Sequence, residues 1–109
     1  MNDKLTLKGI NSANLTVDNS NDPARAYDIT GNVDVTGNSA GNIVGSVAAE
    51  GVNLASFSGY DAGNLSKNLS INFQNVENDT QPEILSAVIA FVNNVSESVK
   101  GGSINTASL

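Results

Sequence analysis

Apolar and polar residues alternate along most of the first 76 positions, in short runs separated by turn-forming residues. Leu5 and Leu7 each stand between polar neighbours, and the same period of two recurs from Asn14 to Asp18. This period is typical of a strand that buries one face, because successive side chains of a strand point to opposite sides. Residues 4–18 therefore predict a β-hairpin.

Residues 26–76 continue the alternation and predict a four-stranded antiparallel meander. The clearest strand of this segment has acidic or polar residues on one face, namely Asp28, Thr30, Asn32, Asp34 and Thr36. Its other face carries Tyr27, Ile29, Val33 and Val35. Further along, Leu69, Ile71 and Phe73 share one parity and mark the last strand.

Turn-forming residues divide this meander. Glu50-Gly51 predicts a tight turn, whereas residues 37–41 and 60–66 predict longer loops. The parity of the apolar positions changes shortly before Phe57, which predicts a β-bulge near Ala55.

The apolar period changes to that of an α-helix after Val76. Thr80 and Glu83 have the spacing of a capping box, and Gly101 follows as a stop signal, so we expect a helix over residues 81–100. Its apolar residues fall in one wide sector: Ile84, Leu85, Val88, Ile89, Phe91, Val92, Val95 and Val99. We expect a shared core that includes Val33, Val35, Ile71, Phe73, Val88, Phe91 and Val92.

Together these elements predict an α+β fold: an antiparallel β-meander of five to six short strands, packed on one face by a single C-terminal amphipathic helix. A length of 109 residues suits a single domain over 1–109. For the tail, residues 101–109, two alternatives stay open: an edge strand through Ile104, or disorder.

Charge limits the classes of partner. The chain has a net charge of −6, and its five cations are scattered, so it offers no basic cluster for phosphates. We therefore expect no binding to nucleic acid and none to an anionic membrane surface.

No run approaches the roughly 18 apolar residues that a transmembrane helix needs. No signal-peptide pattern follows Met1, which favours the cytoplasm, and we expect a bacterial or phage protein.

The chain contains neither histidine nor cysteine, and this absence restricts the possible chemistry more than any other feature of the composition. Without these residues it has no Ser-His triad, no thiolate nucleophile and no zinc site with the usual ligands. We therefore expect no catalytic residues, no cofactor and no enzymatic activity. The weak metal candidates are Asp18 and Asp22, in an aspartate- and asparagine-rich segment that lacks the residue spacing of an EF-hand.

The function that these observations favour is a small non-enzymatic interaction or structural domain, acting through a sheet edge or the flank of the helix. Leu85 and Ile89 lie at one margin of the helix's apolar sector, where one sheet face does not reach. We expect them to form an interface with a protein partner or, by self-association, a homodimer. The alternative is a small ligand-binding module that uses the Asn- and Asp-rich loops for calcium or a glycan.

Overall fold

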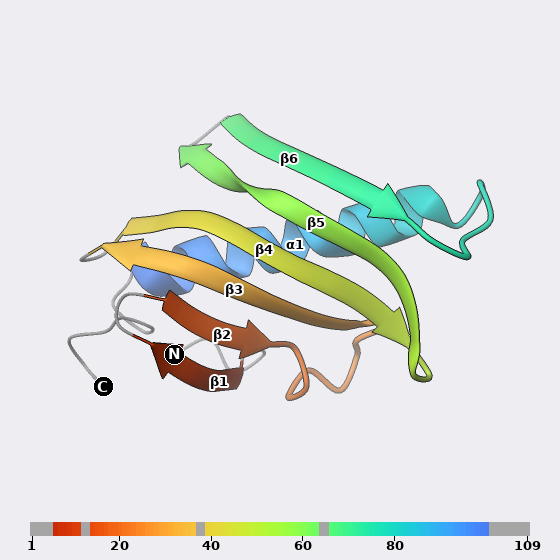
Figure 1. Ribbon diagram of the computed structural model, residues 1–109, viewed down its shortest axis with the longest axis horizontal. Coiled ribbons are helices and arrows are strands. Elements are labelled where there is room, and N and C mark those ends of the chain that lie inside the picture. Colours follow the sequence, from red (N-terminus) through yellow and green to blue (C-terminus); the bar gives the residue numbers. More distant parts are fainter. Residues whose placement is uncertain (1–5, 12–13, 37–38, 64–65, 101–109) are drawn as a thin grey trace.

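The chain folds as an antiparallel meander with one helix on its face (Figure 1). The computed structural model describes residues 6–11, 14–36, 39–63 and 66–100. The elements are β1 (Thr6–Asn11), β2 (Asn14–Asp18), β3 (Asp28–Thr36), β4 (Ser39–Ala49), β5 (Val52–Gly63), β6 (Ser66–Phe73) and α1 (Gln81–Lys100). The six strands form one sheet in sequence order. The predicted α+β class is confirmed; the tail lies outside the described residues.

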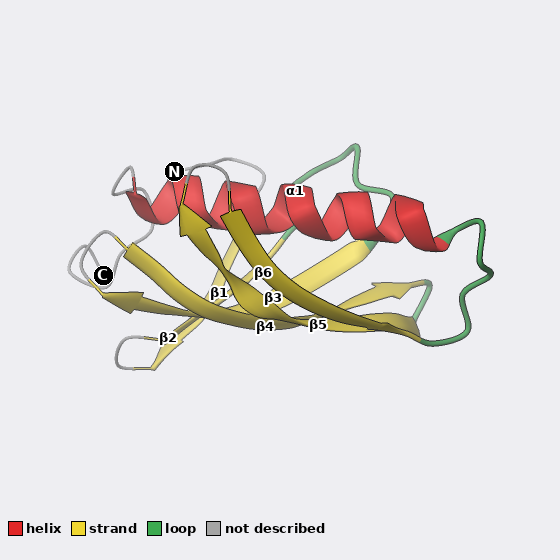
Figure 2. Cartoon of the chain, turned by 90° about the horizontal axis from the view of Figure 1, so that it is seen from above, coloured by secondary structure: helices red, strands yellow, loops and turns green. Residues whose placement is uncertain are grey.

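Helix α1 lies along one face of the sheet (Figure 2), mainly over β4, with β5 and β3 on either side. Its bounds are the predicted ones. The buried helix residues are Ile84, Val88, Phe91, Val92, Val95, Ser98 and Val99. They share a core with apolar residues of four strands: Leu15, Val17, Ile29, Val33, Val35, Ile43, Val47, Ala55 and Phe57. Each large aliphatic side chain buried here stabilises the fold by roughly 1.5–3 kcal/mol.

The predicted division of β3 into two faces is confirmed. Ile29 and Val33 are buried under the helix, whereas Thr30, Asn32 and Asp34 are exposed on the other side. That outer face carries no helix in the described part of the chain (Figure 2). The sheet therefore has one apolar and one polar side, as antiparallel sheets commonly have.

A pair of glycines lets the helix approach the centre of the sheet. Gly31 and Gly45 are directly opposite each other on β3 and β4. The ring of Phe91 lies over Gly31, and the ring of Phe57 occupies the space where Gly45 would carry a Cβ. The two rings meet edge to face, with centroids 6.3 Å apart and planes at 71°. The glycines thus form a depression that the two largest core side chains fill.

The β4–β5 hairpin has the predicted tight turn and the predicted bulge. Glu50 and Gly51 both have positive φ, 52° and 81°, which a two-residue type I′ turn requires. In β5, Ala55 pairs with Val47 and the next pair skips Leu54. The extra residue restores the parity that buries Phe57.

The two loops predicted within the meander are shorter than the composition indicates. β3 and β4 pair as far as Thr36 and Ser39, which reaches into the predicted loop 37–41. β5 stays paired with β6 as far as Gly63, inside the predicted loop 60–66. Both predictions are wrong at these positions because strand pairing satisfies the backbone groups of Gly, Ser and Asn and so overrides their turn propensity.

The helix start differs from the predicted capping box. Thr80 is the N-cap residue, since its carbonyl oxygen accepts the N–H of Ile84 at 3.2 Å. The N–H of Thr80, however, donates to the Glu77 carbonyl at 3.0 Å rather than to the Glu83 carboxylate. That carboxylate instead lies beside the phenol of Tyr27. The turn before the helix already satisfies the donor that the capping box would use.

Candidate interaction surface on strand β6 and helix α1

Strand β6 is one of the two edge strands of the described sheet, and β1 is the other. It is the last strand before the chain leaves the sheet for α1, and among the described strands it pairs only with β5. One side of its backbone therefore presents N–H and C=O groups without a neighbouring strand in the described structure. Figures 1 and 2 show this edge along its full length.

The inward side chains of β6 lie at the margin of the core. Leu69, Ile71 and Phe73 pack against core residues, but each is only half-buried. The reason is the position of α1, which is centred on β4 and so does not cover the sixth strand as fully. The expectation that Ile71 and Phe73 belong to the core is confirmed, at its periphery.

The helix flank above this margin is apolar as well. The other flank, with Ala87, Ala90 and Asn94, faces the segment between β2 and β3. At 3.6 residues per turn, Leu85 and Ile89 lie on the flank that faces β5 and β6. Leu85 is 38% exposed, and Ile89 is half-buried.

Leu85 and Ile89 were identifiable from the width of the apolar helical sector. The residues that sequence reasoning did not assign to this surface are those of β6, Leu69 among them. A signal existed: in a meander of consecutive strands, the last strand before the helix has to be an edge strand. We call the surface formed by Leu69, Ile71, Phe73, Leu85 and Ile89, together with the open backbone edge of β6, the β6 margin.

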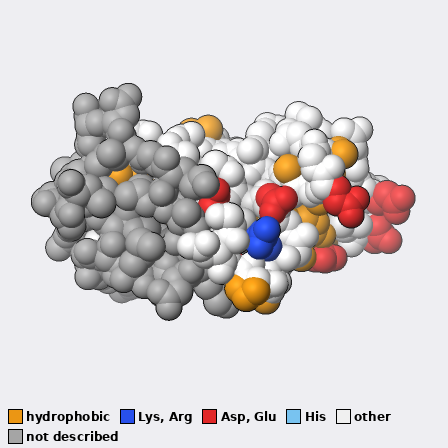
Figure 3. Space-filling view, turned by 90° about the horizontal axis from the view of Figure 1, so that it is seen from below, with side chains coloured by type: hydrophobic (Ala, Val, Ile, Leu, Met, Phe, Trp, Pro, Cys, Tyr) orange, Lys and Arg blue, Asp and Glu red, His pale blue; other side chains and the backbone are white. Residues whose placement is uncertain are grey.

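Acidic residues avoid the β6 margin. Strand β6 has no carboxylate in its sequence, although the chain has eleven Asp and Glu residues. Figure 3 looks at the opposite side of the molecule and shows acidic side chains beside the single blue guanidinium and at the end where α1 begins. The exposed acidic residues of that end are Glu50, Glu77, Asp79 and Glu83. The margin thus has no carboxylate in a strongly acidic chain, and the one charged residue of β6 is Lys67.

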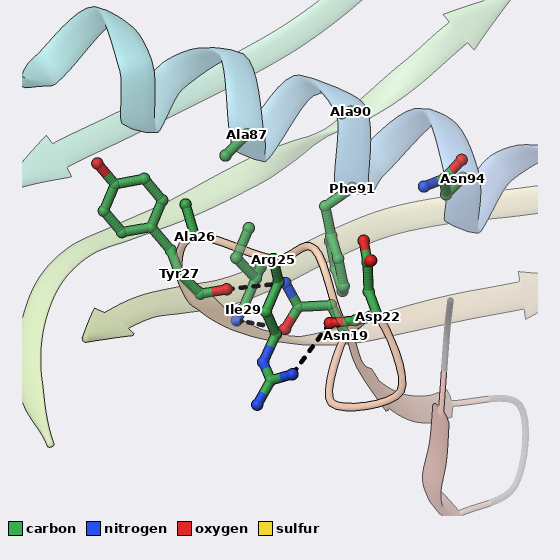
Figure 4. Close-up of a pocket in the computed structure, with 10 residues that line it drawn as sticks. All are labelled: Asn19, Asp22, Arg25, Ala26, Tyr27, Ile29, Ala87, Ala90, Phe91 and Asn94. Carbon is green, nitrogen blue, oxygen red and sulfur yellow. Dashed lines mark hydrogen bonds between the residues drawn. The ribbon is translucent and has the colours of Figure 1, made fainter. Parts of the chain in front are cut away.

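A small pocket lies on the other flank of the helix, under the segment that joins β2 to β3 (Figure 4). Its volume is about 140 Å³. Its lining residues are Asn19, Asp22, Arg25, Ala26, Tyr27, Ile29, Ala87, Ala90, Phe91 and Asn94. Small apolar side chains and one ring form its floor, and polar groups stand at its rim.

Two polar residues of the rim hold the β2–β3 segment in place. The amide of Asn19 donates to the Tyr27 carbonyl and accepts the N–H of Ile29, both at 2.9 Å. The guanidinium of Arg25 pairs with Asp28 at 2.9 Å and donates to the carbonyl of Asp22 at 3.0 Å. These polar groups hydrogen-bond within the β2–β3 segment and fix its path, which accounts for their place at the rim of the pocket.

The two metal candidates, Asp18 and Asp22, are each used in a local turn. Asp18 accepts from the N–H and the hydroxyl of Ser20 at 3.0 and 2.7 Å. Asp22 accepts the N–H of Ala24 at 3.0 Å. In the part of the chain that the structure describes, no three Asp or Glu residues gather where they could hold a metal ion. Their geometry is that of Asx-turns.

The outer face of the sheet carries amides and hydroxyls with two exposed apolar side chains among them. Val44 is 56% and Tyr60 42% exposed. Val44 faces Ser58 across β4 and β5, and Tyr60 faces Asn68 across β5 and β6. Tyr60 therefore offers a ring beside an amide on a flat surface.

Among the described residues, Tyr27 stands out because its pKa is shifted. Burial raises the pKa of the Tyr27 phenol above its usual value, and the neighbouring Glu83 carboxylate raises it further by hydrogen bonding and by repelling a phenolate. The neutral phenol is the form that suits this position. It links the β3 end of the sheet to the first turn of α1.

Comparison of the chain with known protein families, with curated proteins and with solved structures finds no match in any of the three. Nor does the described part of the chain contain a helix that combines the length and the apolar character needed to cross a lipid bilayer. The function therefore has to be argued from the surface itself.

Proposed function

We propose that this chain is a small non-enzymatic interaction domain that binds an extended protein segment at the β6 margin. The observation that carries the proposal is the coincidence of an open strand edge with incompletely buried apolar side chains on the inner face of β6 and on the helix flank above it. An added strand would gain main-chain hydrogen bonds from β6, and its inward side chains would cover Leu85 and Ile89. Strand addition of this kind derives affinity from the backbone and specificity from alternate side chains.

The distribution of charge supports the same surface. Protein interfaces are depleted of charged residues at their centre, and the β6 margin lacks carboxylates in a chain of net charge −6. Edge strands that avoid pairing commonly carry lysine, proline, bulges or inward charges. Strand β6 has one residue of this kind, Lys67, next to its start. The central residues of β6, Asn68 to Phe73, include no proline and no charge.

Selection from a library of displayed linear peptides tests this function. We expect enriched peptides to show alternating apolar residues and to lose binding when β6 carries Ser70→Lys. The matched control is Ser58→Lys, because Ser58 faces Ser70 across β5 and β6 on the same outer surface but lies one strand away from the edge. Peptides that bind both variants equally, or a selection without enrichment, would contradict the proposal.

A second candidate, glycan binding, is favoured by Tyr60 alone. Its ring is 42% exposed and lies beside Asn68, and an aromatic ring next to amides is suited to the apolar face and hydroxyls of a sugar. Screening against an array of immobilised glycans tests this candidate. The expected result is a signal that Tyr60→Ala abolishes and Val44→Ala leaves largely intact; an array without signal rejects it.

A further inference from the structure

We infer that the segment bound at the β6 margin is β6 of a second copy of this chain, paired antiparallel about a twofold axis beside Ser70. This inference rests on the proposed function, because it uses the same surface, and it adds the identity of the partner and the register. The resulting dimer would join two six-stranded sheets into one continuous sheet with a helix from each copy on the same face.

The central part of β6, Asn68 to Asn72, is self-complementary in this register. Ser70 faces itself across the axis, Leu69 faces Ile71 of the partner subunit, and Asn68 faces Asn72 of the partner subunit. From Asn68 to Asn72, apolar residues thus meet apolar residues on the inner face, and amides meet amides on the outer face; beyond this stretch, Lys67 takes the position opposite Phe73 of the partner subunit. A slip of one residue would place apolar side chains opposite polar ones and mismatch the backbone donors. A slip of two residues keeps both patterns, so the cysteine variants described below are what fixes the axis at Ser70.

Covering of the margin supplies the driving force. Leu69, Ile71 and Phe73 are half-buried in the single chain, and Leu85 is 38% exposed above them. In the dimer the corresponding residues of the second copy extend the apolar face across the axis. The backbone edge, which is costly to leave without partners once it is shielded from water, becomes paired at the same time.

The distribution of carboxylates is compatible with a second copy at this side. A chain of net charge −6 repels its copies in general, and that repulsion is weakest where carboxylates are absent. The helix positions of this flank, Leu85, Ile89, Asn93 and Ser96, are uncharged, as are the central residues of β6.

Sedimentation equilibrium of the intact chain, from about 10 µM to about 500 µM, measures the association, because interfaces of modest size dissociate in this range. We expect a monomer–dimer equilibrium in the wild type. Ser70→Lys places two ammonium groups opposite each other and should weaken the dimer at least about tenfold. Ser58→Lys, which adds the same charge one strand away, should leave the constant within about twofold; circular dichroism confirms that both variants are folded.

A cysteine scan tests the axis directly, because the chain has no cysteine of its own. Residues directly opposite each other in an antiparallel pair have Cα atoms about 4.5–5.5 Å apart, within disulfide range. Ser70→Cys should form a disulfide-linked dimer under mild oxidation, and Ser58→Cys should not. A wild type that stays monomeric at about 500 µM, or a dimer that Ser70→Lys does not weaken, overturns the inference. The proposed function fails separately, when no selected peptide depends on Ser70.

Discussion

At the scale of single residues, Gly45 is closely surrounded by its neighbours. A Cβ on this residue would collide with the ring of Phe57 and with the carbonyl oxygen of Thr30. Gly45→Ala should therefore lower the free energy of unfolding by roughly 1–3 kcal/mol through overpacking. Gly41 is the matched control on the same strand, because its Cβ would meet Asp34 at an ordinary 3.5 Å. Urea denaturation should show Gly41→Ala to be neutral or slightly stabilising; equal losses in both variants would refute this account.

Ser98 is a polar residue on the buried side of α1. It is 4% exposed, and its hydroxyl oxygen has no hydrogen-bond partner. An unpaired buried hydroxyl costs roughly 1–3 kcal/mol, and alanine also has the higher helix propensity. We expect Ser98→Ala to raise the free energy of unfolding by about 1 kcal/mol. Ser86→Ala, on the exposed side of the helix, should gain only the few tenths due to propensity, and a destabilised Ser98→Ala would show that the hydroxyl is needed.

Tyr27 makes a prediction about pH. Its pKa is raised in the folded state, so the neutral phenol stabilises the fold fully below the unfolded value of about 10. That contribution is lost as the pH rises from about 10 through the raised folded value. Urea denaturation of wild type and Tyr27→Phe between pH 8 and 11 provides the test. The difference in unfolding free energy between the two proteins should be constant below about pH 10, and above it the wild type should lose stability relative to the variant. A difference that stays constant throughout this range would exclude the linkage.

At the scale of elements, central and edge strands should differ in what a buried ring contributes. Phe57 of β5 is 3% exposed and packs against Phe91, whereas Phe73 of β6 is half-buried. Phe57→Ala should cost roughly 3–5 kcal/mol, as large-to-small changes in a core do, and Phe73→Ala about half of that. Thermal or urea denaturation provides the comparison. A Phe73 variant as unstable as the Phe57 variant would place β6 in the interior.

At the scale of the whole molecule, the helix and four of the strands share one core, and every strand pairs with its neighbour in sequence. No part of this core can open without exposing the rest. We therefore expect one cooperative unfolding transition, with superimposable curves from far-UV circular dichroism and tyrosine fluorescence. Two separated transitions would contradict the prediction of a single domain over 1–109.

The candidate surface was only partly predictable. The margin residues Leu85 and Ile89 follow from the helical sector of α1, which is a local pattern. Their position above Leu69 and Phe73 depends on which strands the helix crosses, and that depends on packing between segments far apart in the chain. For Asp18 and Asp22 the composition indicated a weak metal site. In the structure both carboxylates accept hydrogen bonds within local turns instead.

The sequence by itself determined the period of each segment: the buried and exposed faces of β3, the bounds of α1, and the turn at Glu50-Gly51. These follow from patterns within a few residues, because the backbone geometry of a strand, a helix or a turn fixes the direction of each side chain. Only the tertiary structure decided how far the strands extend, which partner Glu83 takes, and how open the edge at β6 is. Each of these depends on pairing and packing between distant segments, whose energies outweigh local propensity.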